Sequence, residues 1–313
     1  MFLSRLFFCG GLCFPAIGLC DALSLDDALR ATYTACVGID AELSELKKMA
    51  GINTAITGVG TGLGIGATTV GIIKSQRDKE IDAIVSELNS SGATEIKTAE
   101  QLYDVLANAF DETGLSSGHE MANSLRQEIA RKERQSKQLG NWRTGLLAGN
   151  TVTNIAGAII ANQNRVDGDL QLQIDNCKMA VKNLSVSIGQ AGVDGIDVLE
   201  AKSIYDACKE YDYVDISKIN NRAKGATISS VVGGVSGLTG TVTSGVANSD
   251  STRSQKDENG LRTDREKTLN TAANVLAGTS TIASATATVF NAAQIKAIKE
   301  VAVVAAKCTE VLK

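Results

Sequence analysis

The chain has 313 residues, a formal net charge of −4 and only 4% aromatic residues. The scarcity of aromatics predicts a core of small and aliphatic side chains, and the small negative charge gives no indication of a nucleic-acid partner. A single histidine, His119, argues against a histidine metal site and against any catalytic set that needs histidine. The only proline is Pro15, so the rest of the chain favours long helices.

The first residues have the form of a secretory signal peptide. Arg5 precedes an apolar run that extends to about Leu19 and is followed by small residues. We therefore predict a signal peptide over residues 1–20 and export to the periplasm or the cell envelope. An uncleaved membrane anchor and a lipid attached to Cys20 are the alternatives.

Four long stretches beyond the leader carry no charged residue and are rich in Gly, Ala, Ser and Thr. They run from Met49 to Ile73, from Thr144 to Asn164, from Gly225 to Ser249 and from Thr268 to Ile295. Small residues recur in them at every fourth position, which is the small-xxx-small pattern of closely packed helices. Because steps of four exceed the helical period of 3.6, the pattern favours a right-handed helix crossing.

This pattern predicts a set of helix-packing residues. They are Gly58, Gly62, Gly66, Gly145, Gly149, Gly157, Gly225, Gly233, Gly237, Gly245, Ala273, Ala277 and Ala285. The four stretches resemble the glycine-zipper segments of bacterial envelope proteins. That resemblance implies helical hairpins in or against a membrane, and it implies no particular activity.

The stretches are also related to one another, which indicates an internal duplication. The sequence "NTAITGVGTGLGIGATTVGI" at Asn53 resembles "NTAANVLAGTSTIASATATVF" at Asn270. We predict an all-α fold of two related helical hairpins, over residues 23–188 and 189–313. Their polar tips are expected at about 90–118 and 248–263, the second of them mobile.

The four cysteines beyond the leader repeat in step with the hairpins. An even number of cysteines in an exported chain, without close C-x-x-C spacing, indicates two disulfides. We predict the pairs Cys36–Cys177 and Cys208–Cys308, each of which closes the base of one hairpin. The rival pairing joins Cys177 to Cys208 and Cys36 to Cys308.

One motif raises an enzymatic alternative. The stretch from Thr57 to Gly66, "TGVGTGLGIG", fits the Thr-Gly-x-x-x-Gly-x-Gly loop of short-chain dehydrogenases, and Tyr205 and Lys209 have the spacing of that family's catalytic pair. A dinucleotide fold would need a strand before this loop and a second strand after it. The sequence after Gly66 instead predicts one long helix, so the helical interpretation is favoured.

The uncharged stretches are long enough to span a bilayer. Asn150, Asn154 and Asn162 within one of them would be expensive in hydrocarbon, and the flanks show no clear positive-inside asymmetry. We therefore expect a non-enzymatic structural or interaction protein whose hairpins pack in water. Membrane insertion as a helical bundle or pore is the alternative.

The expected partner is an unidentified protein or a second copy of the chain, with a membrane as a further possibility. We predict no nucleic acid, cofactor, metal or small-molecule substrate, and we assign no catalytic residue.

Overall fold

The computed structural model describes residues 24–90, 117–191 and 196–313. Within these ranges the chain is helical apart from short connections, and the one extended pairing is an isolated bridge between Lys256 and Arg262. The predicted all-α class is confirmed. The predicted signal peptide and most of the first tip lie outside the described residues.

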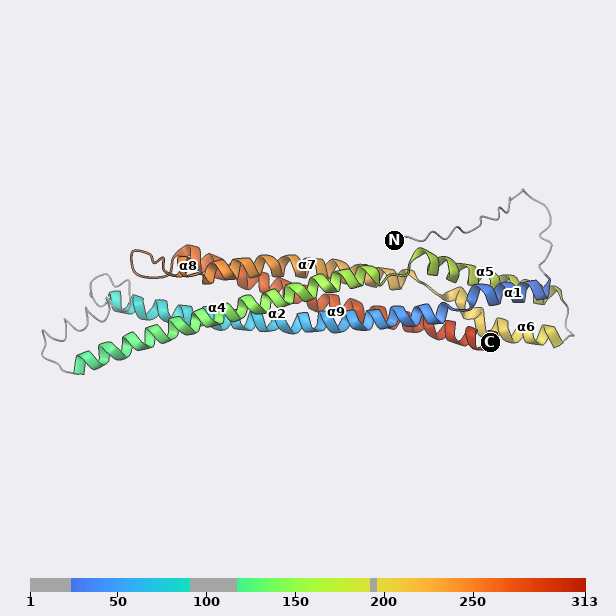
Figure 1. The fold of residues 1–313 in the computed structure, drawn as a ribbon, viewed down its shortest axis with the longest axis horizontal. Helices are drawn as coiled ribbons and strands as arrows, with labels where there is room; N and C mark the ends of the chain where they lie inside the picture. Colours follow the sequence, from blue (N-terminus) through green and yellow to red (C-terminus); the bar gives the residue numbers. More distant parts are fainter. Residues whose placement is uncertain (1–23, 91–116, 192–195) are drawn as a thin grey trace, which may run out of the picture.

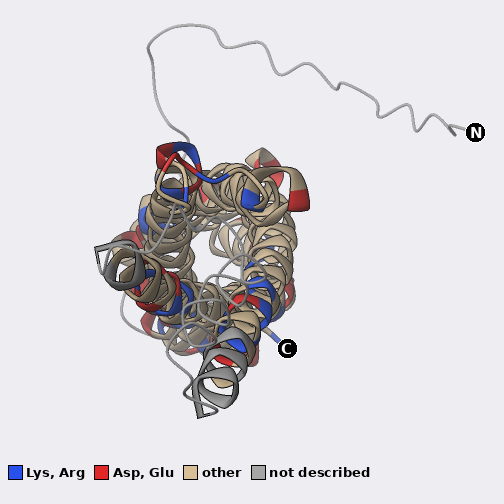
Figure 2. Cartoon of the chain, turned by 90° about the vertical axis from the view of Figure 1, so that its left-hand side faces the viewer, with Lys and Arg blue, Asp and Glu red and all other residues tan. Residues whose placement is uncertain are grey.

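Four long helices form the body of a rod (Figure 1). They are α2 (Ile39–Ser90), α4 (Ser117–Gln163), α7 (Ser217–Asn248) and α9 (Asp264–Leu312). Each helix packs antiparallel against two neighbours in the ring order α2, α4, α7, α9. The end-on view shows the helices arranged around a common axis (Figure 2). The two predicted hairpins are thus present, and they close onto each other into one four-helix bundle.

A cap covers one end of the bundle. It consists of α1 (Leu25–Cys36), α5 (Gly168–Gln190), α6 (Ile196–Cys208) and the short 3-10 helix η1 (Lys209–Tyr213). The sharp turn from α1 into α2 uses Gly38, whose φ of 98° suits glycine. The largest apolar core of the described residues lies here, where the cap packs on the ends of α2 and α9.

Both disulfides lie at this cap end. Cys36 of α1 is bonded to Cys177 of α5, and Cys208 of α6 is bonded to Cys308 of α9. The predicted pairing is confirmed, and the first disulfide ties the cap helices together while the second ties the cap to the bundle. All four cysteine side chains are fully buried.

The opposite end of the rod is the tip. There the connection between α7 and α9 carries α8 (Asp250–Arg253), and Thr263 caps α9 by accepting a hydrogen bond from the backbone of Glu266. The tip was expected to be mobile, but Arg253 bonds Ser136 of α4 and Arg262 bonds Asp82 of α2. These contacts join the tip to α2 and α4.

The buried positions of the bundle follow a heptad repeat. On α7 they run through Ile219, Ala223, Ala226, Ser230, Gly233, Gly237, Gly240, Ser244 and Ala247. On α9 they run through Glu266, Asn270, Ala273, Ala277, Ser280, Ser284, Ala287, Asn291, Gln294 and Ile298. Steps of four and three alternate, so the mean spacing of about 3.5 residues is that of a left-handed coiled coil. The predicted right-handed crossing is therefore wrong.

The same repeat corrects part of the predicted packing set. A Cβ at Gly58, Gly62, Gly145 or Gly245 would meet nothing within 4 Å, so the packing role predicted for these four is wrong. We call the buried face of each helix, with its alternating steps of four and three, the heptad seam. Residues spaced only in steps of four gradually leave this face, and on α2 the seam instead holds other glycines. A Cβ at Gly64 would lie 2.6 Å from the Thr281 hydroxyl.

The remaining predicted positions lie on or beside the seam. Gly66 and Gly149 face leucine side chains at 3.4 and 3.1 Å, measured from an added Cβ. Gly157, Gly225, Gly233 and Gly237 face side chains of neighbouring helices at 2.6–2.9 Å on the same measure. Ala273 and Ala277 are fully buried, whereas Ala285 is half-buried.

Candidate functional site

The interior of the middle of the bundle holds paired polar side chains beside small apolar ones and Leu147. The Asn150 amide of α4 donates to Ser280 Oγ of α9 at 2.9 Å, and Ser280 in turn donates to the Gly233 carbonyl of α7 at 2.7 Å. One turn away, the Asn154 amide donates to Ser284 Oγ at 2.8 Å. These hydrogen bonds cross the bundle between three helices and satisfy groups that are fully buried.

A second polar layer lies nearer the cap. Asn53 of α2 donates to Asn291 of α9 at 3.0 Å, and the Asn291 amide donates to the Thr57 hydroxyl at 3.3 Å. All three side chains are fully buried. We call the buried polar side chains of both layers the polar axis; they are Asn53, Thr57, Asn150, Asn154, Ser280, Ser284 and Asn291.

A buried arginine lies where the polar interior meets the tip. The Arg143 guanidinium of α4 donates to Ser244 of α7 at 2.8 Å and to Asn270 and Asn274 of α9, both at 2.9 Å. It is fully buried, and all three of these acceptors are neutral. A Cβ at Gly71 of α2 would lie 3.2 Å from its Cδ, so Arg143 reaches all four helices.

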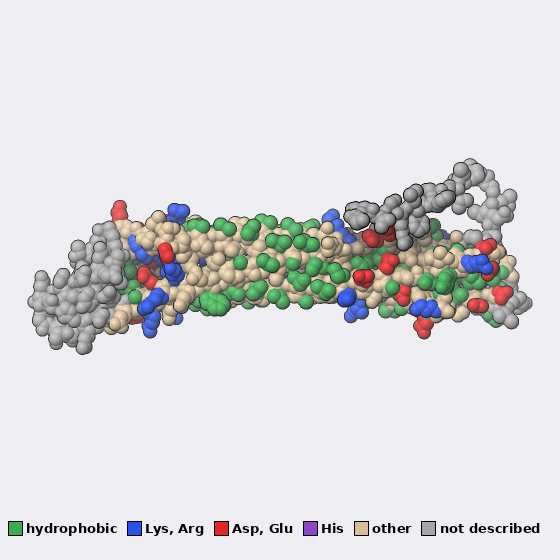
Figure 3. Space-filling model, in the orientation of Figure 1, with side chains coloured by type: hydrophobic (Ala, Val, Ile, Leu, Met, Phe, Trp, Pro, Cys, Tyr) green, Lys and Arg blue, Asp and Glu red, His purple; other side chains and the backbone are tan. Residues whose placement is uncertain are grey.

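The outside of the same segment is apolar. Its outward side chains are 49% (Ile155) to 70% (Ile282) exposed. We call them the apolar belt; they are Val59, Ile65 and Ile72 on α2, Val152, Ile155 and Ile159 on α4, Val231, Val235, Leu238 and Val242 on α7, and Val275, Ile282 and Val289 on α9. In Figure 3 the middle of the rod shows apolar side chains and no charge, whereas charged side chains gather towards both ends.

The edges of the belt coincide on the four helices. At the cap edge each uncharged stretch meets a cation, namely Lys48, Arg165, Lys224 and Lys296. At the tip edge the stretches meet Lys74, Arg143, Asp250 and Lys267. The belt is thus about 30–40 Å tall at 1.5 Å per residue, close to the thickness of a hydrocarbon core.

Two helical regions are long and apolar enough to cross a membrane by length and composition. They are Leu25–Ser86 and Gln127–Gln190, with mean hydropathies of 1.5 and 1.2 in their most apolar windows. Only 28% and 33% of those windows is buried inside the protein.

The tip holds a buried ion cluster. Lys74 donates to Asp78 at 2.6 Å, and Arg262 reaches Asp78 at 2.9 Å and Asp82 at 2.6 Å. Ser136 of α4 also donates to Asp78. Burial raises the pKa of Asp78, but Lys74 and Arg262 outweigh it and hold the pKa below its usual value. Burial lowers the pKa of Lys74, and its attraction to Asp78 only partly offsets this.

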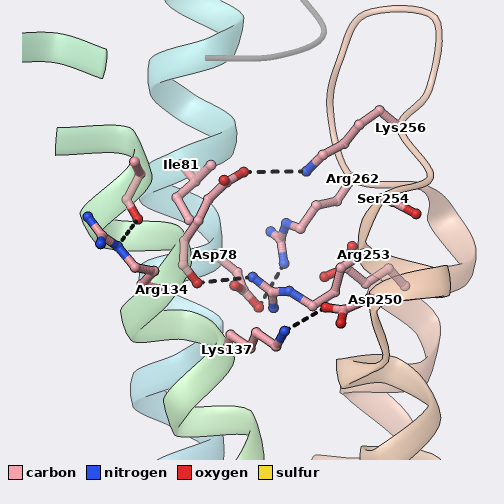
Figure 4. A pocket seen from close by; sticks show the side chains of 12 residues that line it. Asp78, Ile81, Arg134, Lys137, Asp250, Arg253, Ser254, Lys256 and Arg262 are labelled. Atoms are coloured by element: carbon pink, nitrogen blue, oxygen red, sulfur yellow. Dashed lines mark hydrogen bonds and ion pairs between the residues drawn. The ribbon is translucent and has the colours of Figure 1, made fainter. Parts of the chain in front are cut away.

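A pocket of about 430 Å³ opens beside this cluster, between α2, α4, α8 and the start of α9 (Figure 4). We call it the tip pocket. On its rim Lys137 bonds Asp250 at 2.7 Å and Lys256 reaches Glu133 at 3.9 Å. Its lining also includes Glu266, which is 1% exposed and whose pKa is raised by burial.

The residues of the enzymatic alternative lie far apart in the fold. Thr57–Gly66 is helical throughout and lies in the middle of α2, so these residues do not form the glycine turn of a dinucleotide site. Tyr205 lies in α6 and Lys209 in η1, both in the cap, and Lys209 donates to Asp206 at 2.8 Å. His119 lies at the start of α4.

Sequence reasoning missed the belt and the tip pocket. A helical wheel drawn at 3.5 residues per turn would have found the belt, because it places Asn and Ser on one side and Val and Ile on the other. Comparison of the chain with protein-family models, with curated proteins and with solved structures gives no match.

Proposed function

We propose that the chain is an exported, membrane-embedded four-helix bundle with a non-enzymatic role as an anchor. The observation that carries the proposal is the inversion of polarity in the middle of the rod. Val235, Ile282 and their equivalents lie outside, while Asn150, Ser280 and their equivalents lie inside. In water this arrangement would expose many apolar side chains around the middle of the rod, at the cost of leaving their surface wet.

In a bilayer the side chains of the apolar belt would contact lipid, so their exposure would carry no such cost. Polar side chains in membrane proteins face the bundle interior and pair there, and small residues let helices approach closely. Of the asparagines that argued against insertion from the sequence, Asn162 is exposed near the cap end of α4, whereas Asn150 and Asn154 are paired inside the bundle. Their hydrogen bonds across the axis favour an anchor over an open pore, because a pore would require these side chains to separate.

The disulfides suggest an orientation. Both lie in the cap, and disulfides persist in oxidising compartments. The cap would face the outer compartment, which agrees with a cleaved leader before α1, and the tip would face the opposite side. The anchor would then hold a rigid cap outside the membrane.

Alkaline carbonate extraction of cell membranes tests the proposal. We expect the protein to stay in the membrane pellet. Maleimide labelling of Tyr213→Cys in the cap, which is 88% exposed, should occur on intact cells, whereas Ser254→Cys in the tip should react only after permeabilisation.

Three outward lysine substitutions sharpen this test: Val152→Lys, Val235→Lys and Ile282→Lys in one chain. In lipid each would cost about 2.5–3.5 kcal/mol, whereas on a wetted surface each would change stability by about 0.5 kcal/mol or less. The matched control carries Leu172→Lys, Met179→Lys and Leu199→Lys in the cap, where the side chains are 59–67% exposed. Loss of membrane retention in the belt variant alone supports the anchor; release of the wild-type protein refutes it.

A further inference from the structure

The ionisable groups that line the tip pocket mostly pair with one another. Lys137 is paired with Asp250, and Lys256 with Glu133. Arg262 is held by Asp78 and Asp82. Arg134 turns its guanidinium away from the other cations, towards the Ala130 carbonyl at 3.3 Å (Figure 4).

Two groups of opposite charge remain. Arg253 donates to the Ser136 hydroxyl and the Glu133 carbonyl, both at 3.2 Å, and it has no carboxylate within 4.0 Å among the described residues. Neither carboxylate oxygen of Glu266 has a hydrogen-bond partner in the described part of the chain. A buried carboxylate without a donor is costly, so this group needs one from elsewhere.

The neighbouring cations do not meet that need. Lys74 and Arg262 act on Glu266 through space, but both are bonded to Asp78 or Asp82. Arg253 also acts at a distance without reaching an ion pair. The lining of the pocket therefore includes a buried carboxylate without a hydrogen-bond donor and a guanidinium free of carboxylates.

The position of the tip pocket along the rod suggests the source of a ligand that would pair with Glu266 and Arg253. Asp78 and Ile81, which line it, lie four and seven residues beyond Lys74, where the belt ends on α2. That distance corresponds to about 6–10 Å along the helix. The headgroup layer of a bilayer lies at this depth outside the hydrocarbon core.

We propose that the tip pocket binds a phosphoethanolamine group, with its ammonium donating to Glu266 and its phosphate accepting from Arg253. An ammonium supplies the N–H donors that the buried carboxylate lacks, and a guanidinium matches phosphate geometry. The lipid source, phosphatidylethanolamine, rests on the proposed membrane location. Free phosphoethanolamine offers the same chemistry from solution.

Lipid retention by the purified protein tests this inference. The protein is placed in nanodiscs of equal parts phosphatidylethanolamine and phosphatidylcholine, extracted gently, and analysed by native mass spectrometry. Phosphatidylcholine carries a quaternary ammonium without N–H donors, so the wild type should retain phosphatidylethanolamine preferentially. Glu266→Gln should weaken that preference by about tenfold or more, the effect of losing one charged hydrogen bond, whereas Arg253→Gln should lower the retention of both lipids, because both carry the phosphate.

The exposed residues Glu310 and Arg222 provide matched controls, and Glu310→Gln and Arg222→Gln should keep the preference. Equal retention of both lipids by a membrane-embedded wild type overturns the lipid source but leaves the anchor intact. Calorimetry with free phosphoethanolamine then tests whether the tip pocket binds this group from solution. Binding that depends on Glu266 supports the pocket even if the protein does not insert, and absence of both kinds of binding overturns the inference.

Discussion

At the residue scale, glycines on the heptad seam leave no room for a Cβ, whereas glycines off the seam can be replaced by alanine without a clash. A Cβ at Gly64 would lie 3.1 Å from the Thr281 Cα, which is backbone and cannot turn aside. A Cβ at Gly62, two residues earlier on the same helix, would meet nothing within 4 Å. The two glycines therefore offer a matched pair.

Gly64→Ala should lower the free energy of unfolding by about 1–3 kcal/mol, because overpacking forces the helices apart. Gly62→Ala should raise it by up to about 1 kcal/mol, because alanine is the better helix former. Thermal unfolding of both variants under the same conditions measures the difference. Equal destabilisation by the two alanines would contradict the seam.

Because Glu266 is buried, we expect the free energy of unfolding to depend on pH. Its pKa is raised by burial, although Arg262 and Lys74 act in the opposite direction. The folded state then holds its proton at pH values where the unfolded state has lost it, so the free energy of unfolding falls as pH rises from the ordinary glutamate pKa through the raised one.

Glu266→Gln removes this effect and should stabilise the protein more at pH 8 than at pH 4. Melting temperatures at the two pH values check it, with Glu310→Gln as a control for replacing a surface glutamate. A stabilisation that is larger at pH 4 would reverse the sign and contradict the account.

At the scale of elements, the sequence predicted more of the connections than of the packing. The absence of proline and the four uncharged stretches predicted long helices, and the repeated cysteine helices predicted both disulfides. Pairing was predictable because the duplication placed Cys36 with Cys177 in the same way as Cys208 with Cys308.

The packing seam was predicted only in part, for a physical reason. In the uncharged stretches glycine occurs on both the inner and the outer side of α2, as Gly60 and Gly62 illustrate. Composition alone therefore could not orient the helix. The seam is identified by the burial of Asn and Ser together with the exposure of Val and Ile, and that depends on which helices become neighbours. The tip pocket is lined by Asp78 of α2, Arg253 of α8 and Arg262 of the connection before α9, and no local sequence pattern predicts that they meet.

The disulfides predict the stability of the cap. They close loops with sequence separations of 141 and 100 residues, and in the entropy model each stabilises by about 4–5 kcal/mol. Replacing Cys208 and Cys308 together by alanine should lower stability by about that amount, with hydrogen exchange increasing in the cap before the belt segment. Unchanged exchange in α6 of this variant would contradict the role of this bond as the link between cap and bundle.

At the scale of the whole molecule, one inversion of polarity organises the rod. Charged and apolar packing similar to that of soluble proteins is found at the tip and in the cap, while the segment between them is polar inside and apolar outside. In the proposed bilayer location the belt would lie in lipid and both ends in water, since the height of the belt is close to the thickness of the hydrocarbon core.

Spin labels placed along the belt test this claim most directly. All four cysteines in the described residues are in disulfides, so single cysteines at Val152, Val235 and Ile282 can be labelled selectively, with Tyr213 and Ser254 marking the two ends. In liposomes the account predicts that the belt labels are accessible to oxygen and shielded from a water-soluble nickel reagent, and that the end labels show the reverse. Belt labels that the nickel reagent reaches as readily as the end labels would place the bundle in water and contradict the account.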